Sequence, residues 1–227
     1  MLLPIKNLLN TEQLAHLHTC LAQAEWADGK ATAGSQSAAV KFNEQLPEQS
    51  QTARELGQLV LQQLGQHALF LSAALPHTIY PPLFNRYTGG QHFGMHIDNA
   101  LRAIPGTRQL LRTDLSATLF LSDPASYTGG ELVIHTELGV REIKLPAGDL
   151  LLYPASTLHQ VKPVTHGTRL ASFMWIQSMV QDTRYREVLF NLDQSIQQLS
   201  ASLGNNHTNV VELTGVYHNL LRMQMAS

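Results

Sequence analysis

The chain has 227 residues, a formal net charge of -2 and a charged fraction of 14%, with no long basic or acidic run. This balance argues against a surface that neutralises nucleic-acid phosphates, so we expect no nucleic-acid partner. The single cysteine, Cys20, excludes an intrachain disulfide and favours a reducing, cytoplasmic compartment. Neither a signal peptide nor a run of about 20 apolar residues is present, so we expect no membrane span.

The N-terminal third reads as helices around an irregular stretch. Leucines three and four residues apart predict a helix over 11–24, which Asn10 can cap. The stretch 31–43 has no helical period, and we expect a strand between turns there. A second apolar stripe predicts a helix over 50–71. We assign 1–75 to a support region.

From about Pro76 the pattern changes to short β-like runs separated by Gly, Pro and Asp. Residues 140–145 alternate between apolar and charged side chains, which is typical of a half-buried strand. Many short strands at this spacing favour a double-stranded β-helix, or jelly roll, over 76–178, in a fold that is mainly β with flanking helices. The expected strands are 78–87, 92–97, 115–121, 131–135, 140–145, 148–153, 159–163 and 169–177.

The last segment, 179–227, returns to a helical pattern. Helices are expected from about 181 to 203 and from 209 to 223, separated by Gly204-Asn205-Asn206. The apolar face of such a hairpin must pack on something. Two readings stay open: a brace on the catalytic domain, or a subunit interface that makes a homo-oligomer.

The triplet His96-Ile97-Asp98 is the first sign of chemistry. Residues i and i+2 of an extended segment project from the same side, so this imidazole and carboxylate can meet one ion. A second histidine would complete the 2-His-1-carboxylate arrangement that marks non-haem iron(II) oxygenases. We predict that His159 is that third ligand and that the three residues form the catalytic metal site.

A second triplet of this kind, His135-Thr136-Glu137, competes with the first. In a jelly roll the first two ligands come from an early strand and the last from a late one. The interval from His96 to His159 accommodates about four strands of typical length with their turns. The interval from His135 to His159 does not, so we read His135 as a histidine at a strand end.

Arg169 adds an independent element at the start of the β-like run that follows His159. Two antiparallel strands with a short turn would bring it close to that histidine. A guanidinium binds a carboxylate through two parallel hydrogen bonds. We therefore predict that Arg169 binds the distal carboxylate of 2-oxoglutarate.

Several motifs together resemble one known family. The chain is similar to the prolyl 4-hydroxylase-like branch of the 2-oxoglutarate oxygenases, and more closely to the bacterial PKHD-type hydroxylases, often described as iron-uptake factors. The resemblance covers essentially the whole chain, including the helical tail. It rests on Trp26-Ala27-Asp28-Gly29, Thr32-Ala33-Gly34, Asn85-Arg86-Tyr87-x4-His92-Phe93-x2-His96-x-Asp98, Tyr127-x-Gly129-Gly130-Glu131-Leu132, Pro146-x-Gly148-Asp149 and Leu158-His159-x-Val161-x-Pro163-Val164-x2-Gly167-x-Arg169.

The resemblance implies a double-stranded β-helix, one iron(II) per chain, 2-oxoglutarate as cosubstrate and dependence on L-ascorbate. It also implies hydroxylation of a substrate with release of succinate and carbon dioxide, linked to iron uptake. Tyr87 stands where related enzymes often have a tyrosine that contacts the cosubstrate, although a core tyrosine is an equal reading. The alternative is a non-catalytic, cupin-like iron-binding or iron-sensing module. A zinc hydrolase with the same three ligands is not supported, because the sequence contains no His-Glu-x-x-His motif.

We expect the partners to be dioxygen and a primary substrate that is a small molecule or a peptide. No motif in the sequence identifies that substrate. The loop 99–114 follows the first two ligands directly and carries Arg102, Arg108 and Arg112. Long loops beside a site often read substrates, and three arginines would favour an anionic one. A solvated surface loop is the competing reading.

Overall fold

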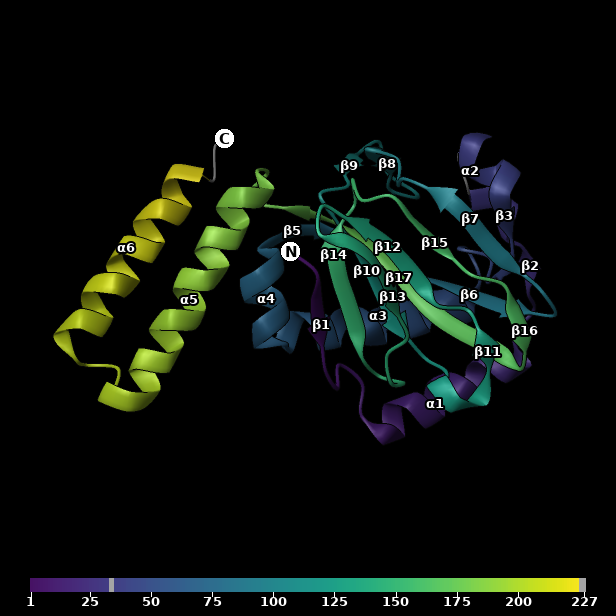
Figure 1. Ribbon diagram of the computed structural model, residues 1–227, viewed down its shortest axis with the longest axis horizontal. Helices are drawn as coiled ribbons and strands as arrows, with labels where there is room; N and C mark the ends of the chain where they lie inside the picture. The colour runs from purple at the N-terminus through teal and green to yellow at the C-terminus, as the bar shows by residue number, and fades with distance from the viewer. Residues whose placement is uncertain (33–34, 225–227) are drawn as a thin grey trace.

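The computed structural model describes residues 1–32 and 35–224, and Figure 1 shows a β-rich body from which two helices project. Ala33 and Gly34, part of the Thr32-Ala33-Gly34 motif, lie outside the described residues. The helices are α1 (Thr11–Gln23), α2 (Ser35–Val40), α3 (Gln51–Gln66), α4 (Ala68–Ala74), α5 (Thr183–Leu203) and α6 (Thr208–Gln224), with 3-10 turns at Gly29–Thr32 and Pro124–Ser126.

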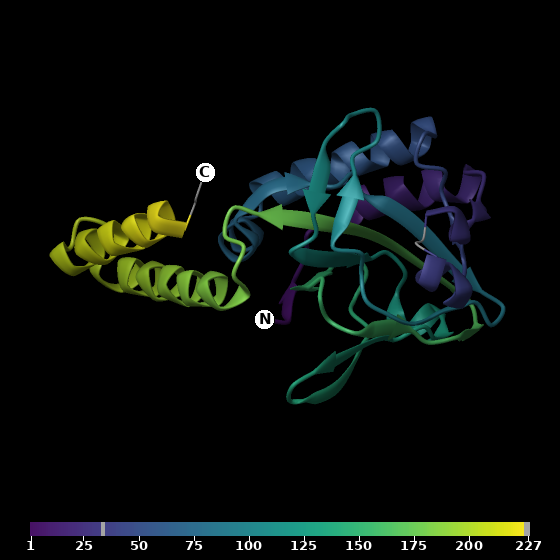
Figure 2. The same cartoon turned by 90° about the horizontal axis from the view of Figure 1, so that it is seen from above.

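The body is built from two antiparallel sheets that face each other (Figure 2). In the larger sheet the order is β1 (Leu3–Ile5), β14 (Leu150–Pro154), β10 (Leu115–Phe120), β17 (Thr168–Ser178), β6 (Leu83–Thr88), β4 (Glu44–Gln45) and β2 (Ala27–Asp28), and β5 (Pro76–Ile79) also pairs with β17. In the smaller sheet the order is β13 (Gly139–Ile143), β12 (Leu132–Thr136), β15 (His159–Val161), β7 (His92–His96) and β3 (Lys41–Phe42). Two short pairs, β11 (Thr128–Gly129) with β16 (Val164–His166) and β8 (Leu101–Ala103) with β9 (Leu110–Arg112), complete the body.

Each face of the larger sheet has its own core. Helices α1 and α3 bury Leu17, Leu21, Leu56 and Leu64 in the same cluster as the sheet residue Ile176. A separate cluster that includes Tyr87, Phe120, Ile134 and Val161 fills the space between the two sheets. The alternation of strand side chains therefore sends one set to the helices and the other set to the interior, where the site lies.

The fold prediction is confirmed: the structure has large antiparallel sheets of the jelly-roll type, with a C-terminal helical pair. The predicted helix over 50–71 is wrong in one detail, because it breaks at His67. His67 leaves the helical conformation with ψ 103°, and its Nδ1 accepts a hydrogen bond from the Phe70 amide, so it caps α4. The stretch 31–43 holds the short helix α2 as well as the expected strand, β3.

Two further expectations need correction. The predicted strand over 78–87 is interrupted at Pro81-Pro82, which lack the N–H groups that a sheet requires, and it divides into β5 and β6. The segment 99–114 is a β-hairpin rather than an irregular loop, with Leu101 opposite Arg112 in the register. This hairpin lies directly after the first ligand pair in the chain.

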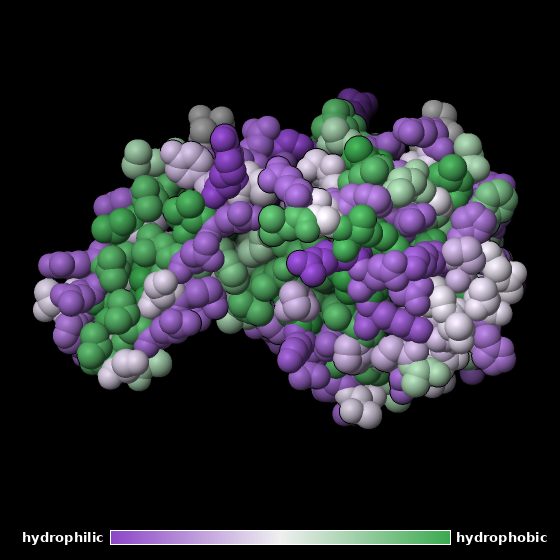
Figure 3. All heavy atoms as spheres, viewed as in Figure 1, coloured by the Kyte–Doolittle hydropathy of each residue, from purple (hydrophilic) through white to green (hydrophobic). Residues whose placement is uncertain are grey.

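The C-terminal hairpin of α5 and α6 touches the body along one side only. Leu189 of α5 packs with Leu75 and Val180, and Arg186 donates to the Val180 carbonyl at 2.6 Å. Exposed apolar side chains gather on the rest of the hairpin, where Figure 3 shows a hydrophobic surface between the two helices; they include Val188, Leu199, Leu203, Val211 and Val216. The brace and the subunit-interface readings are therefore compatible. The division at 75 and 178 stays a prediction, and no described helix is long and apolar enough to cross a membrane.

Candidate metal and cosubstrate site

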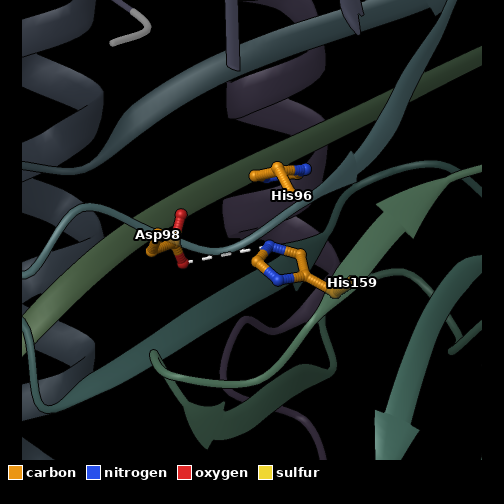
Figure 4. A group of neighbouring side chains, drawn as sticks. All are labelled: His96, Asp98 and His159. Carbon is orange, nitrogen blue, oxygen red and sulfur yellow. Dashed lines mark ion pairs between the residues drawn. The ribbon is translucent and has the colours of Figure 1, made fainter. Parts of the chain in front are cut away.

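The structure brings His96, Asp98 and His159 together. Strands β7 and β15 are antiparallel neighbours, and their register places His96 directly opposite His159. The two imidazole rings are 4.2 Å apart between centroids. One nitrogen or oxygen atom of each residue lies within 4.8 Å of the others, and Figure 4 shows the three side chains converging on one point.

Asp98 reaches this point from the loop that follows β7. Its Oδ2 accepts a hydrogen bond of 2.6 Å from the hydroxyl of Ser116 on β10. The larger sheet thus fixes the carboxylate, while the smaller sheet supplies both imidazoles. Ser116 is almost fully buried, so water does not compete for this bond.

The hydrogen bonds of the histidines define which ring nitrogens face the site. The Nδ1 atom of His96 is 2.8 Å from the Gly94 carbonyl oxygen, and that of His159 is 2.8 Å from the Thr157 carbonyl oxygen. A carbonyl can only accept, so each Nδ1 carries a proton, and each Nε2 is the ring nitrogen left to face the site. Backbone partners of this kind orient histidines that bind metals.

Charge and protonation also fit a metal ion. Burial, followed by the neighbouring His159, lowers the pKa of His96 to about 4, so this imidazole is neutral at pH 7. Nε2 of His159 and Oδ2 of Asp98 face each other across 3.8 Å (Figure 4). A metal cation between them would bind both atoms. Two imidazoles and one carboxylate match the ligand set of non-haem iron(II).

The competing triplet does not take part. Among the described residues, the one group of three or more potential ligands that converges is His96, Asp98 and His159. His135 lies on β12, where its amide donates to the Leu158 carbonyl at 2.9 Å. Its position in the sheet accounts for it without a metal.

Arg169 lies in the wall of the same pocket with only 1% of its surface exposed. Its guanidinium carbon is 5.2 Å from the ring of Tyr87 and 5.5 Å from the ring of Phe120. Its Nε and Nη2 atoms have no hydrogen-bond partner in the protein. Buried charged donors without acceptors are costly, so these two nitrogen atoms fit an anionic ligand of the pocket.

Tyr87 lies beside that guanidinium. It is the register partner of Arg169 across β6 and β17, and it is fully buried in the pocket wall. Its hydroxyl accepts a hydrogen bond of 3.3 Å from Asn85. Burial raises the pKa of the Tyr87 phenol, against the opposing effect of Arg169, so the hydroxyl stays protonated and can donate to a carboxylate.

The Gly129-Gly130 motif makes room for the arginine. Gly130 has φ +70°, and a Cβ there would lie 2.8 Å from Val164 Cγ2 and 2.9 Å from Arg169 Cδ. Only glycine combines this conformation with so close an approach. The motif therefore serves the position of Arg169.

Sequence reasoning missed three polar residues that line or support the site. They are Lys41 on β3, Asn85 on β6 and Ser116 on β10, and all three are buried. Asn85 stood inside a motif, two residues before Tyr87, and this spacing alone would have placed both on one face. Lys41 and Ser116 carried no signal, because only the pairing of distant strands brings them to the pocket.

Comparisons with known proteins agree with this site. Residues 82–177 match the 2OG-Fe(II) oxygenase superfamily, and residues 183–224 match the PKHD-type hydroxylase C-terminal domain. The chain resembles a prolyl hydroxylase of Trichoplax adhaerens with a TM-score of 0.53 and 14% identity, over 82% of this chain and 86% of that one. It also resembles a Pseudomonas putida prolyl-4-hydroxylase with a TM-score of 0.50 and 18% identity, over 78% and 92% of the two chains. At these identities the likeness extends to the fold alone.

Sequence relatives are much nearer. A PKHD-type hydroxylase of Pseudomonas paraeruginosa is 56% identical over 98% of both chains. The PKHD-type hydroxylase PiuC of Pseudomonas aeruginosa is 55% identical over the same shares. With more than half of its residues shared along nearly the whole length, the chain belongs to the PKHD-type hydroxylases and is an iron(II)- and 2-oxoglutarate-dependent oxygenase.

Proposed function

We propose that His96, Asp98 and His159 bind iron(II) and that Arg169, with Tyr87, binds the distal carboxylate of 2-oxoglutarate. The observation that carries this assignment is the buried Arg169 guanidinium, which has two unpartnered nitrogen atoms in the pocket that holds the triad. A module that only binds or senses iron would leave this buried charge without a ligand. The reaction hydroxylates a small-molecule or peptide substrate, and it consumes dioxygen and releases succinate and carbon dioxide.

When bound, iron(II) and 2-oxoglutarate supply the oxidising chemistry. The protein supplies orientation and a dry environment. Three ligands on one face leave adjacent positions open for the cosubstrate and dioxygen. Arg169 and Tyr87 fix the far end of the cosubstrate, and the apolar residues Leu132 and Val161 of the pocket wall exclude water.

An anaerobic titration tests the assignment. Wild-type protein with iron(II) should develop a visible metal-to-ligand charge-transfer band as 2-oxoglutarate is added. Arg169→Ala should retain iron and lose most of its affinity for the cosubstrate, because a buried, charged, bidentate contact disappears. Arg141→Ala, which removes an exposed arginine of β13, is the matched control. Tight cosubstrate binding by Arg169→Ala would refute the role of Arg169.

We also propose L-ascorbate as the reductant that returns the metal to iron(II) after turnovers without substrate. A cytoplasmic location suits this chemistry, because iron(II) and the free thiol of Cys20 both require reducing conditions. Repeated turnover should then slow without ascorbate and recover when it is added. Equal progress curves with and without ascorbate would exclude this dependence.

A homo-oligomer through the C-terminal hairpin is the partner that we propose. The exposed apolar side chains of α5 and α6 would pack on the same surface of a second copy. Arginines and carboxylates balance over 183–224, so two copies would not repel each other. Val211→Glu should shift sedimentation toward a smaller species without changing turnover, and an unchanged sedimentation coefficient would count against this interface.

A further inference from the structure

The pocket has a second cationic wall, on the side away from Arg169. Lys41 of β3 is 3% exposed, and its Nζ donates to Gln45 Oε1 at 2.9 Å. The same Nζ lies 5.4 Å from the ring centroid of Phe93, and that ring stacks on His96 with centroids 3.6 Å apart. One aromatic ring therefore separates this ammonium from a proposed iron ligand.

Arg102 of the β8–β9 hairpin is the other member of this wall. Its guanidinium carbon lies 4.4 Å from the ring centroid of Trp175 and 5.2 Å from that of Tyr80. Phe173 and Trp175 alternate along β17 on the same face as Arg169, and both line the pocket. One strand thus carries the proposed cosubstrate anchor near its start and an aromatic surface near its end.

Most of the charged side chains that line the pocket are cationic. Among the described residues of its wall, Lys41, Arg102 and Arg169 are cationic, and Asp98 is the acidic one. The proposed iron and cosubstrate site uses Asp98 and Arg169. It uses neither Lys41 nor Arg102, which lie in the same pocket wall.

The pKa of Lys41 reflects both its burial and its charged neighbours. Burial, and then the nearby Arg102, lower the pKa of Lys41 to about 8. Asp28, Glu48 and Asp98 act in the opposite direction, and of these three Asp98 lines the pocket. Glu48 is engaged by the Tyr80 hydroxyl at 3.0 Å. An anion held between Lys41 and Arg102 would relieve the repulsion that these residues exert on each other.

We propose that Lys41 and Arg102 bind an anionic group of the substrate to be hydroxylated, while Phe173 and Trp175 hold its apolar part. The substrate is thus an organic acid with an apolar or aromatic portion. This inference rests on the proposed function, since it takes Asp98 as an iron ligand and Arg169 as the cosubstrate anchor.

A comparison of the three arginines in the β8–β9 segment supports the choice of Arg102. Arg112 is committed to Asp114, with Nε 2.7 Å from Oδ1. Arg108 is exposed. Of the three arginines that the sequence placed beside the site, Arg102 is the one that reaches the pocket. Its stacking on Trp175 joins the cation to the aromatic surface.

Calorimetry on the anaerobic enzyme loaded with iron(II) and 2-oxoglutarate provides the test. The probes are phenylacetate with phenylacetamide, and N-benzoylglycine with its primary amide. Each pair shares a skeleton and differs in charge. We expect each acid to bind at least about tenfold more tightly than its amide, as charge-assisted pairing requires. Lys41→Met and Arg102→Met should each abolish most of this preference.

Two further variants serve as controls. Arg108→Met removes an exposed cation from the same hairpin and should keep the preference. Lys41→Arg keeps the charge and should restore part of the preference that Lys41→Met loses. The charge-transfer band and the 2-oxoglutarate affinity are measured in every sample to show that the site is folded. If Lys41→Met fails to fold, Arg102→Met alone decides.

Equal affinities of acid and amide in the wild type would overturn this inference, and so would absence of binding by all four probes. A preference that survives both methionine variants would also overturn it. Lack of the charge-transfer band in the wild type is a different result, because it would refute the proposed function itself. The two failures are therefore distinguishable in one set of samples.

Discussion

The two sides of the pocket are built in different ways. On the proposed iron side, His96 and His159 lie on paired strands and Asp98 follows one of these strands. A backbone carbonyl or Ser116 fixes each of the three side chains. On the side of Lys41 and Arg102, the supporting strands β3 and β8 span Lys41–Phe42 and Leu101–Ala103 only. The comparison indicates that register within the paired sheets positions the proposed iron ligands, while short peripheral elements carry the two cations that we propose to bind the substrate.

The largest effect is expected from the iron side. His159→Ala removes one of the three proposed ligands, and iron affinity should fall by more than the roughly 10–100-fold range typical of a supporting residue. Turnover of 2-oxoglutarate should then reach background. His135→Ala is the matched control, since this histidine lies outside the cluster and should leave turnover unchanged. Equal activity of His159→Ala and His135→Ala would contradict the assignment of His159 as an iron ligand.

Ser116→Ala tests whether the carboxylate depends on its hydrogen bond. The variant should lower iron affinity by about 10–100-fold, because Asp98 loses the donor that fixes its orientation. Competition with a metal-sensitive chelator would measure this affinity. Ser116→Thr keeps a hydroxyl and should recover most of it. Unchanged affinity in Ser116→Ala would mean that Asp98 is held by the metal alone.

The sequence predicted the proximity of His96, Asp98 and His159, whereas it predicted little of the wall that contains Lys41 and Arg102. His96, Asp98, His159 and Arg169 belong to motifs whose spacing reflects strand length, so the pattern contained their proximity. The hairpin at 99–114 depends instead on contacts that periodicity does not record. Lys41 lies in a segment without any period, and its burial arises only when β3 pairs with β7. The helix break at His67 escaped because the apolar pattern continues across it. The strand break at Pro81-Pro82 is different, because two prolines without N–H groups are a strand breaker that the sequence itself shows.

Gly130→Ala tests the space that the iron side reserves for Arg169. Strain at φ +70° and the overlap with Val164 and Arg169 should together lower the free energy of unfolding by about 2 kcal/mol or more. Gly139→Ala is the control, because it has φ +113° and nothing within 4 Å of the added Cβ. Denaturant unfolding of both separates overlap from strain. Only Gly130→Ala should also weaken 2-oxoglutarate binding. Equal losses of stability and of 2-oxoglutarate affinity in the two variants would show that Gly130 makes no special room for Arg169.

The smallest expected effect concerns pH on the substrate side. Lys41 has a pKa of about 8, so it is protonated below pH 8 and loses its charge above it. The affinity for phenylacetate should be constant below pH 7 and fall by up to about tenfold by pH 9, since only the ammonium attracts the acid. Among its charged neighbours, Arg102 lowers the pKa of Lys41, whereas Asp28, Glu48 and Asp98 raise it.

The free energy of unfolding should change with pH in the opposite direction to the acid affinity, over a neighbouring pH range. The pKa of Lys41 is lowered from 10.5 in the folded state, so the unfolded chain binds more protons between about pH 8 and 10.5. The Lys41 contribution to the free energy of unfolding therefore rises with pH in that window, while acid binding declines. Lys41→Met should remove both trends together. If only one of them disappears, the group that titrates is not the group that binds the acid, and the substrate side would have to be assigned to Arg102 alone.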